Sequence, residues 1–172
     1  PGSIQDTYAL VMDLWQPGLG VVTDGKTAVG ALQVEPNLKL AAQWADGIQL
    51  PSYDYAFFSG DDSALELVFH WEAKRKVTHN YKRYLHVIDV RSGEIVLQED
   101  VTPSRTTPTE AWERGTMIDD VAYLNFTGLN AGEYDIVVGL YDEASGQRLS
   151  AFHDDGEQYP NDAVYLGRII RQ

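Results

Sequence analysis

An acidic loop near the C-terminal end of the chain carries the side chains best suited to hold a metal ion. Asp154 and Asp155 are adjacent, and Asp162 follows seven residues after Asp155. Carboxylates on a flexible loop suit Ca²⁺, although this spacing is not that of an EF-hand loop. The loop therefore indicates either a calcium site formed by these three aspartates or a solvated acidic segment that binds nothing.

Aromatic side chains suggest a second kind of site, one that binds carbohydrate. Flat exposed rings beside polar groups can stack on the C–H faces of sugars. The chain has ten Tyr, five Phe and four Trp. Trp112 lies in a turn-rich stretch and Tyr159 lies in the acidic loop, so these two aromatics are the best candidates for exposure. With His153, at the start of the same loop, they form the candidate carbohydrate-binding set. For Trp112, packing in the core or at a hinge is the favoured interpretation over exposure.

Catalytic signatures are missing from the sequence. It contains no Gly-Xaa-Ser-Xaa-Gly elbow, phosphate-binding loop, dinucleotide fingerprint or paired-histidine metalloprotease motif. His86 stands in an apolar stretch and is interpreted as a structural histidine rather than a ligand or a base. A hydrolase that uses paired carboxylates is an alternative without motif support. We therefore expect no catalytic residue and no enzyme activity in this chain.

Charge and cysteine content exclude several further classes. The formal net charge is −13 and there is no cysteine, which argues against general nucleic-acid binding and excludes disulfide frameworks. The longest uncharged run, 121–132, is shorter than the roughly 20 residues that a membrane span needs. Five of the thirteen basic residues fall within 74–83, where we expect a hairpin tip, either solvated or facing anionic headgroups or an acidic partner. These five are Lys74, Arg75, Lys76, Lys82 and Arg83.

Short β-type segments are expected to position these residues. Seven runs rich in β-branched and aromatic residues are separated by Gly, Pro, Asn, Asp and Ser turns. Only 39–46 could form a single helical turn. Many short strands at regular spacing predict an all-β fold, a two-layer antiparallel β-sandwich that is immunoglobulin-like or carbohydrate-binding-module-like. The predicted strands are 8–15, 65–71, 84–90, 94–101, 123–126, 134–141 and 164–170.

The chain divides into three parts. Residues 1–3 look like the remnant of a cleaved tag. Residues 4–36 are predicted to form a β-hairpin that resembles the tail of a preceding homologous unit, because 8–15 aligns with 134–141 at an offset of 126 (134 minus 8). The alternative is that two apolar strands look alike by chance. Residues 37–172 are the expected sandwich, and we expect the hairpin to pair with it rather than stand apart.

A series of short motifs over 65–170 resembles a known family. The first motifs are Leu67-Val-Phe-His-Trp71 and Tyr84-Leu-His-Val-Ile-Asp89. They are followed by Pro108-Thr109, Trp112 and Gly115. The last motifs are Val138-Gly-Leu-Tyr-Asp142 and Gly146-Gln-Arg-Leu149. In order and spacing they resemble the C-terminal extracytoplasmic β-sandwich domain of bacterial polytopic membrane glycosyltransferases, which are similar to dolichyl-phosphate-mannose protein mannosyltransferases. The basic run at 74–83 and the acidic loop at 153–162 depart from that pattern.

The resemblance implies a non-catalytic, carbohydrate-binding-like accessory domain outside the cytoplasm, joined to a membrane only through its parent protein. In that family the catalytic carboxylates lie in the membrane-embedded half, so none is carried over to this chain. The implied partners are a glycan or the membrane-embedded part of the parent, and no cofactor is implied apart from the calcium considered above. The alternative is an immunoglobulin-like structural or adhesion module of a tandem array, without a glycan site.

Overall fold

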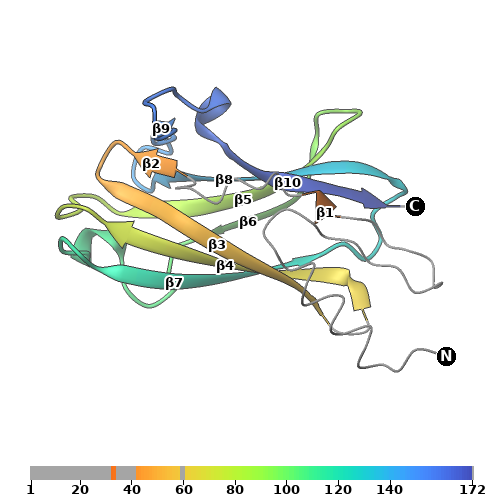
Figure 1. The fold of residues 1–172 in the computed structure, drawn as a ribbon, viewed down its shortest axis with the longest axis horizontal. Helices are drawn as coiled ribbons and strands as arrows, with labels where there is room; N and C mark the ends of the chain where they lie inside the picture. Colours follow the sequence, from red (N-terminus) through yellow and green to blue (C-terminus); the bar gives the residue numbers. More distant parts are fainter. Residues whose placement is uncertain (1–31, 34–41, 59–60, 172) are drawn as a thin grey trace.

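Two five-stranded antiparallel sheets face each other in the computed structural model, which describes residues 32–33, 42–58 and 61–171 (Figure 1). Sheet 1 has the strand order β1-β10-β8-β5-β6, and sheet 2 has the order β7-β4-β3-β2-β9. The predicted two-layer antiparallel β-sandwich is confirmed. The strands are β1 (Leu32–Gln33), β2 (Ala42–Trp44), β3 (Ile48–Phe58), β4 (Asp61–Ala73), β5 (Tyr81–Asp89), β6 (Ile95–Val101), β7 (Met117–Asn125), β8 (Gly132–Asp142), β9 (Ala151–Phe152) and β10 (Val164–Arg171).

Period-two alternation builds the core between the sheets. On β4 the buried side chains are Leu65, Leu67, Phe69 and Trp71, and on β8 they are Tyr134, Ile136, Val138 and Leu140. Successive side chains of a strand point to opposite faces, so each strand gives one face to the core and one to the outside. The apolar residues of 134–141 and Trp71 are expected in the core, and this is confirmed for Trp71 and for the four buried residues of β8. It is wrong for Val137 and Tyr141, which are only partly buried and line cavities on the outer face.

Helix is confined to two three-residue 3₁₀ turns in the described residues, η1 (Thr109–Ala111) and η2 (Pro160–Asp162). The expected low helix content is therefore confirmed for this part of the chain. The single helical turn that 39–46 could form is not present in the described part of that range, where Ala42–Trp44 forms β2 and the side chains of Ala42 and Trp44 are buried in the core. No helix in the described ranges has the length and apolar character needed to cross a bilayer.

The crossover from β6 in sheet 1 to β7 in sheet 2 passes through η1. The Thr109 hydroxyl accepts the Tyr81 backbone N–H at 2.7 Å and donates to the His79 carbonyl at 2.9 Å. Gly115 has a φ of +85°, a backbone conformation that favours glycine. This segment thus makes the tight strand-to-strand connection that its Pro, Thr and Gly residues predict.

Most of the predicted N-terminal hairpin lies outside the described residues. Within 4–36 only Leu32–Gln33 is described, and it pairs with β10 through Leu32 opposite Ile169 and Gln33 opposite Arg168. The hairpin itself and its pairing with the sandwich stay predictions. The tag-like residues 1–3 and the strand predicted at 8–15 fall outside the described ranges, so their expected roles stay predictions.

Candidate functional site

The outward face of sheet 1 carries a row of polar and aromatic side chains. On β5, Leu85 and Val87 point into the core, so the alternating Tyr84, His86 and Ile88 lie on the outer face. Strand register then fixes their neighbours, because residues paired across antiparallel strands share one face. Tyr84 is paired with Asp100 on β6 and Gly139 on β8, and His86 is paired with Gln98 and Val137.

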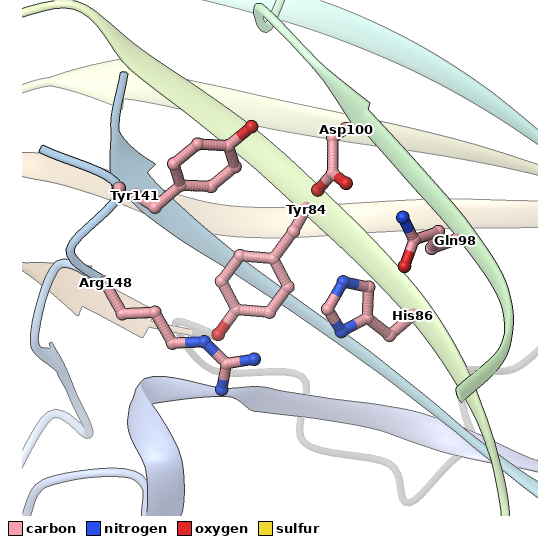
Figure 2. Close-up of a pocket in the computed structure, with 7 residues that line it drawn as sticks. Tyr84, His86, Gln98, Asp100, Tyr141 and Arg148 are labelled. Atoms are coloured by element: carbon pink, nitrogen blue, oxygen red, sulfur yellow. The ribbon is translucent and has the colours of Figure 1, made fainter. Parts of the chain in front are cut away.

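These side chains surround a cavity of about 280 Å³ on that face. The connection between β8 and β9 supplies Arg148 and Gly146 to the same cavity. In Figure 2 the Tyr84 ring lies in the middle, with Arg148 on one side and Gln98 and Asp100 on the other. The full lining is Tyr84, His86, Gln98, Asp100, Tyr141, Gly146 and Arg148.

Tyr84 is the fixed centre of this cavity. Its hydroxyl donates to the Asp162 carbonyl oxygen at 2.8 Å, and the guanidinium carbon of Arg148 lies 4.6 Å from its ring centroid. A Cβ at Gly139 would overlap the Tyr84 ring and its hydroxyl oxygen, so the absence of a side chain there is what allows the ring to lie across β8. Arg148 is held in turn, because its Nη1 donates to the Asn161 carbonyl at 2.9 Å.

Four polar groups around this centre are open to a ligand. Within the described ranges, the side chains of His86, Gln98, Asp100 and Tyr141 form no hydrogen bond and no ion pair with another residue. Gln98 and Asp100 are exposed, whereas His86 is only 8% exposed. Donors and acceptors thus converge on one cavity with their bonding capacity unused by the protein.

Burial sets the protonation states of this cluster. Desolvation lowers the pKa of His86. The charge of Asp100 raises this pKa and the charge of Arg148 lowers it, and the net pKa is lowered. Desolvation raises the pKa of Tyr84 to about 12 and also raises the pKa of Tyr141. At neutral pH the cavity therefore presents an uncharged imidazole and protonated phenols. Such a set can exchange hydrogen bonds with a polyhydroxy molecule.

The aromatic residues chosen from the sequence lie elsewhere than expected. Trp112 is 1% exposed and packs in the core, so the favoured interpretation of core packing is confirmed and its place in the exposed carbohydrate-binding set is wrong. Tyr159 is 9% exposed, so its expected exposure is also wrong. Its ring stacks on His153 with the centroids 3.5 Å apart, and it lines a second cavity next to the first. A role for Tyr159 and His153 in glycan binding stays a prediction.

The acidic loop uses its carboxylates for local hydrogen bonds. Asp155 accepts the Glu157 backbone N–H at 3.0 Å, and Asp162 accepts the Gln158 amide at 2.7 Å. In the part of the chain that the structure describes, no three His, Cys, Asp or Glu side chains are grouped to hold a metal ion, so Asp154, Asp155 and Asp162 are not assembled as a site. Calcium binding by this loop stays a prediction.

The basic run at 74–83 is compensated by neighbouring carboxylates. Arg83 belongs to β5 and is fully buried, so its expected place at an exposed hairpin tip is wrong. The others all form ion pairs, which weakens the argument for an anionic partner here. The pairs are Lys74–Glu72 at 2.7 Å, Arg75–Asp46 at 3.5 Å, Lys76–Glu113 at 2.6 Å and Lys82–Glu143 at 2.8 Å.

Sequence reasoning did not single out Gln98, Asp100, Tyr141 or Arg148 as functional residues. The available signal was the alternation of Tyr84, His86 and Ile88, which places a polar–aromatic set on the face opposite Leu85 and Val87. Register was needed to add the residues of β6 and β8 to that set.

No protein-family model matches the chain, and no curated protein matches it. Among solved structures, the C-terminal domain of wzt is 12% identical with a TM-score of 0.49, over 80% of this chain and 79% of that one. The putative ApaA protein from Bordetella pertussis is 7% identical with a TM-score of 0.33, over 78% and 95% of the two chains. Chicken MD-1 complexed with lipid IVa is 9% identical with a TM-score of 0.34, over 78% and 99%. All three TM-scores lie below 0.5, so these likenesses carry no argument about function.

Proposed function

We propose that the chain is a non-catalytic carbohydrate-binding domain and that it binds glycan in the cavity on the outer face of sheet 1. One observation carries the proposal: His86, Gln98, Asp100 and Tyr141, whose side chains form no hydrogen bond or ion pair within the described ranges, converge around the ring of Tyr84. Sugar hydroxyls need hydrogen-bond partners and sugar C–H faces pack on aromatic rings, and this cavity offers both. A cavity of about 280 Å³ suits a short glycan or a single terminal sugar.

The wider setting of the domain is a proposal that rests on the motif resemblance over 65–170. That resemblance supports an accessory domain on the extracytoplasmic side, attached to a membrane glycosyltransferase or an envelope protein. The domain then holds acceptor glycan near the catalytic part of its parent.

Titration calorimetry on a glycan panel tests this proposal. We expect weak binding that Gln98→Ala and Asp100→Asn each reduce at least tenfold, because both side chains are exposed groups of the cavity. Glu110→Gln, an exposed carboxylate on η1, is the matched control and leaves affinity unchanged.

Two outcomes would overturn the assignment. If no glycan of a broad panel binds at millimolar concentration, the immunoglobulin-like structural module becomes the better interpretation. If binding occurs but both cavity variants bind as the unsubstituted protein does, the glycan site lies elsewhere.

A further inference from the structure

A second cavity of about 400 Å³ adjoins the first on the outer face of sheet 1, and it is mainly apolar. Its walls include Ile88, Ile95, Val137, Tyr159 and Tyr165. Ile95 is 46% exposed and Tyr165 is 41% exposed, which makes them two of the five large hydrophobic side chains that the described residues leave exposed. Exposed apolar side chains that gather in a hollow commonly mark a binding surface.

The two cavities are continuous. His86 and Arg148 line both of them. Register also joins them, because His86 is paired with Gln98 and with Val137, and Val137 is paired with Tyr165. One row of side chains therefore crosses four strands, from a polar end on β6 to an apolar end on β10. At a spacing of about 4.8 Å between strands, this row is about 14 Å long.

We propose that the natural ligand is an amphipathic glycoside, whose sugar ring occupies the polar cavity and whose apolar alkyl or acyl substituent occupies the apolar one. This inference rests on the proposed function, because it adds the second half of the same ligand. The length of the row fits one sugar ring followed by a short chain, and is too small for a folded partner. Because the apolar cavity is continuous with the polar one, a single ligand with a polar part and an apolar part is favoured over two separate ligands.

Matched pairs of methyl and hexyl glycosides of glucose, galactose and mannose test the inference by calorimetry, with hexanol as the purely apolar probe. Each fully buried methylene strengthens binding about fourfold, so burying three of the five added methylenes gives about 60-fold. We expect the hexyl glycoside to bind at least tenfold more tightly than its methyl partner. Ile95→Ser and Tyr165→Ser remove most of that gain, whereas methyl glycoside binding stays unchanged.

Met117→Ser is the matched control, because Met117 is 74% exposed but lies on β7 of the other sheet. It leaves the gain from the hexyl chain intact. Equal affinities for methyl and hexyl glycosides would overturn the inference and leave the proposed function standing.

The remaining outcomes are also decisive. Hexanol binding as tightly as hexyl glycoside, without any effect of Gln98→Ala, would overturn the sugar site and leave only an apolar one. Absence of binding by every glycoside would overturn both proposals. Self-association of the protein that Ile95→Ser abolishes would show that a second copy, not a glycoside, covers the apolar cavity.

Discussion

A buried ion pair connects the two sheets, and its removal is the sharpest stability test that the fold offers. Arg83 on β5 of sheet 1 donates from Nε to Asp120 on β7 of sheet 2 at 2.7 Å, and both side chains are fully buried. Asp120 also accepts the Trp71 indole N–H at 3.3 Å, and Arg83 also donates to Glu99 at 2.8 Å. We predict that either single substitution destabilises the protein strongly, and that the double substitution does not.

The magnitudes follow from what each substitution leaves behind. Removing one partner of a buried ion pair costs about 3–5 kcal/mol, because the other charge stays buried without compensation. Asp120→Ala leaves Arg83 paired with Glu99, so we expect about 3 kcal/mol. Arg83→Met leaves Asp120 with only the Trp71 indole, so we expect about 5 kcal/mol.

The double variant Arg83→Met/Asp120→Leu removes both charges at once. Within the described residues, Arg83 Nη1 and Asp120 Oδ1 have no hydrogen-bond partner, so the native pair leaves part of its desolvation uncompensated. Apolar replacements of similar size are often neutral or stabilising at such positions. We therefore expect the double variant to lie within about 1 kcal/mol of the unsubstituted protein.

Urea unfolding followed by circular dichroism and tryptophan fluorescence measures these free energies, with the m-value as the check on two-state behaviour. The exposed pair Lys76–Glu113 provides the control, since breaking an exposed pair costs less than about 1 kcal/mol. Single variants that lose less than about 1 kcal/mol would refute the reasoning. A double variant that loses the sum of both single effects would refute it equally.

Four further predictions follow from individual residues. Trp71→Ala, in the core, costs about 3–5 kcal/mol in the same unfolding assay, and a loss below about 1 kcal/mol would contradict its burial. Gly139→Ala pushes the Tyr84 ring out of the cavity, so it weakens glycan binding; unchanged affinity would show that this ring is not needed. The lowered pKa of His86 means that only the unfolded state binds a proton there between the folded-state pKa and the ordinary value of 6.5. Stability therefore falls as the pH drops from about 6.5 toward the folded-state pKa, by up to about 1.4 kcal/mol per pH unit. In urea melts run at several pH values, the His86→Gln variant should not show this loss of stability. Identical pH profiles for the variant and the unsubstituted protein would contradict the lowered pKa of His86. A glycosidase and esterase screen gives no turnover, and turnover that a single Asp or Glu substitution abolishes would contradict a non-catalytic chain.

The sandwich could be predicted because local pattern and tertiary structure agree along most strands. On β8, alternation from Tyr134 to Leu140 gives the core face directly. The turn after β8 also has the geometry that its Asp, Ser and Gly residues predict. The Asp142 carboxylate accepts the Ser145 N–H at 2.7 Å, and Gly146 has a φ of +71°.

Elements that break the simple pattern were missed. β3 contains Pro51 and the charged Asp54, which weaken a strand signal, and its register with β4 shifts between Gln49 and Ser52. Such irregularities accommodate a proline that cannot donate a ladder hydrogen bond. β2 is only three residues long and gains its partners from β3 and β9, so no local pattern could identify it.

The candidate site could not be predicted from the sequence for a different reason: the register between strands decides which residues line it. Gln98 and Tyr141 are 43 residues apart (141 minus 98) and line one cavity only because β6 and β8 flank β5. Trp112 was chosen for a turn-rich neighbourhood, which predicts exposure on average and fails where a crossover turns inward. Long-range pairing, not residue type, decides which side chains meet.

The opposite face of the sandwich gives an internal comparison for the proposed site. On the outer face of sheet 2, His70 bonds Asp119 at 2.7 Å and Asp54 at 3.0 Å, so these polar groups satisfy one another. Burial lowers the pKa of His70, but the hydrogen bonds that its ring forms with the two acceptor aspartates outweigh this effect. The net pKa of His70 is therefore raised, which favours a protonated and paired ring. The His86 cavity on sheet 1 has the reverse arrangement: an imidazole whose pKa is lowered lies next to an amide and a carboxylate that form no hydrogen bond or ion pair in the described ranges. Two faces of one fold, built from similar residue types, thus differ in whether their polar groups are already bonded. Because unused hydrogen-bonding capacity in a hollow is what a ligand can use, the face of sheet 1 is the one suited to bind it.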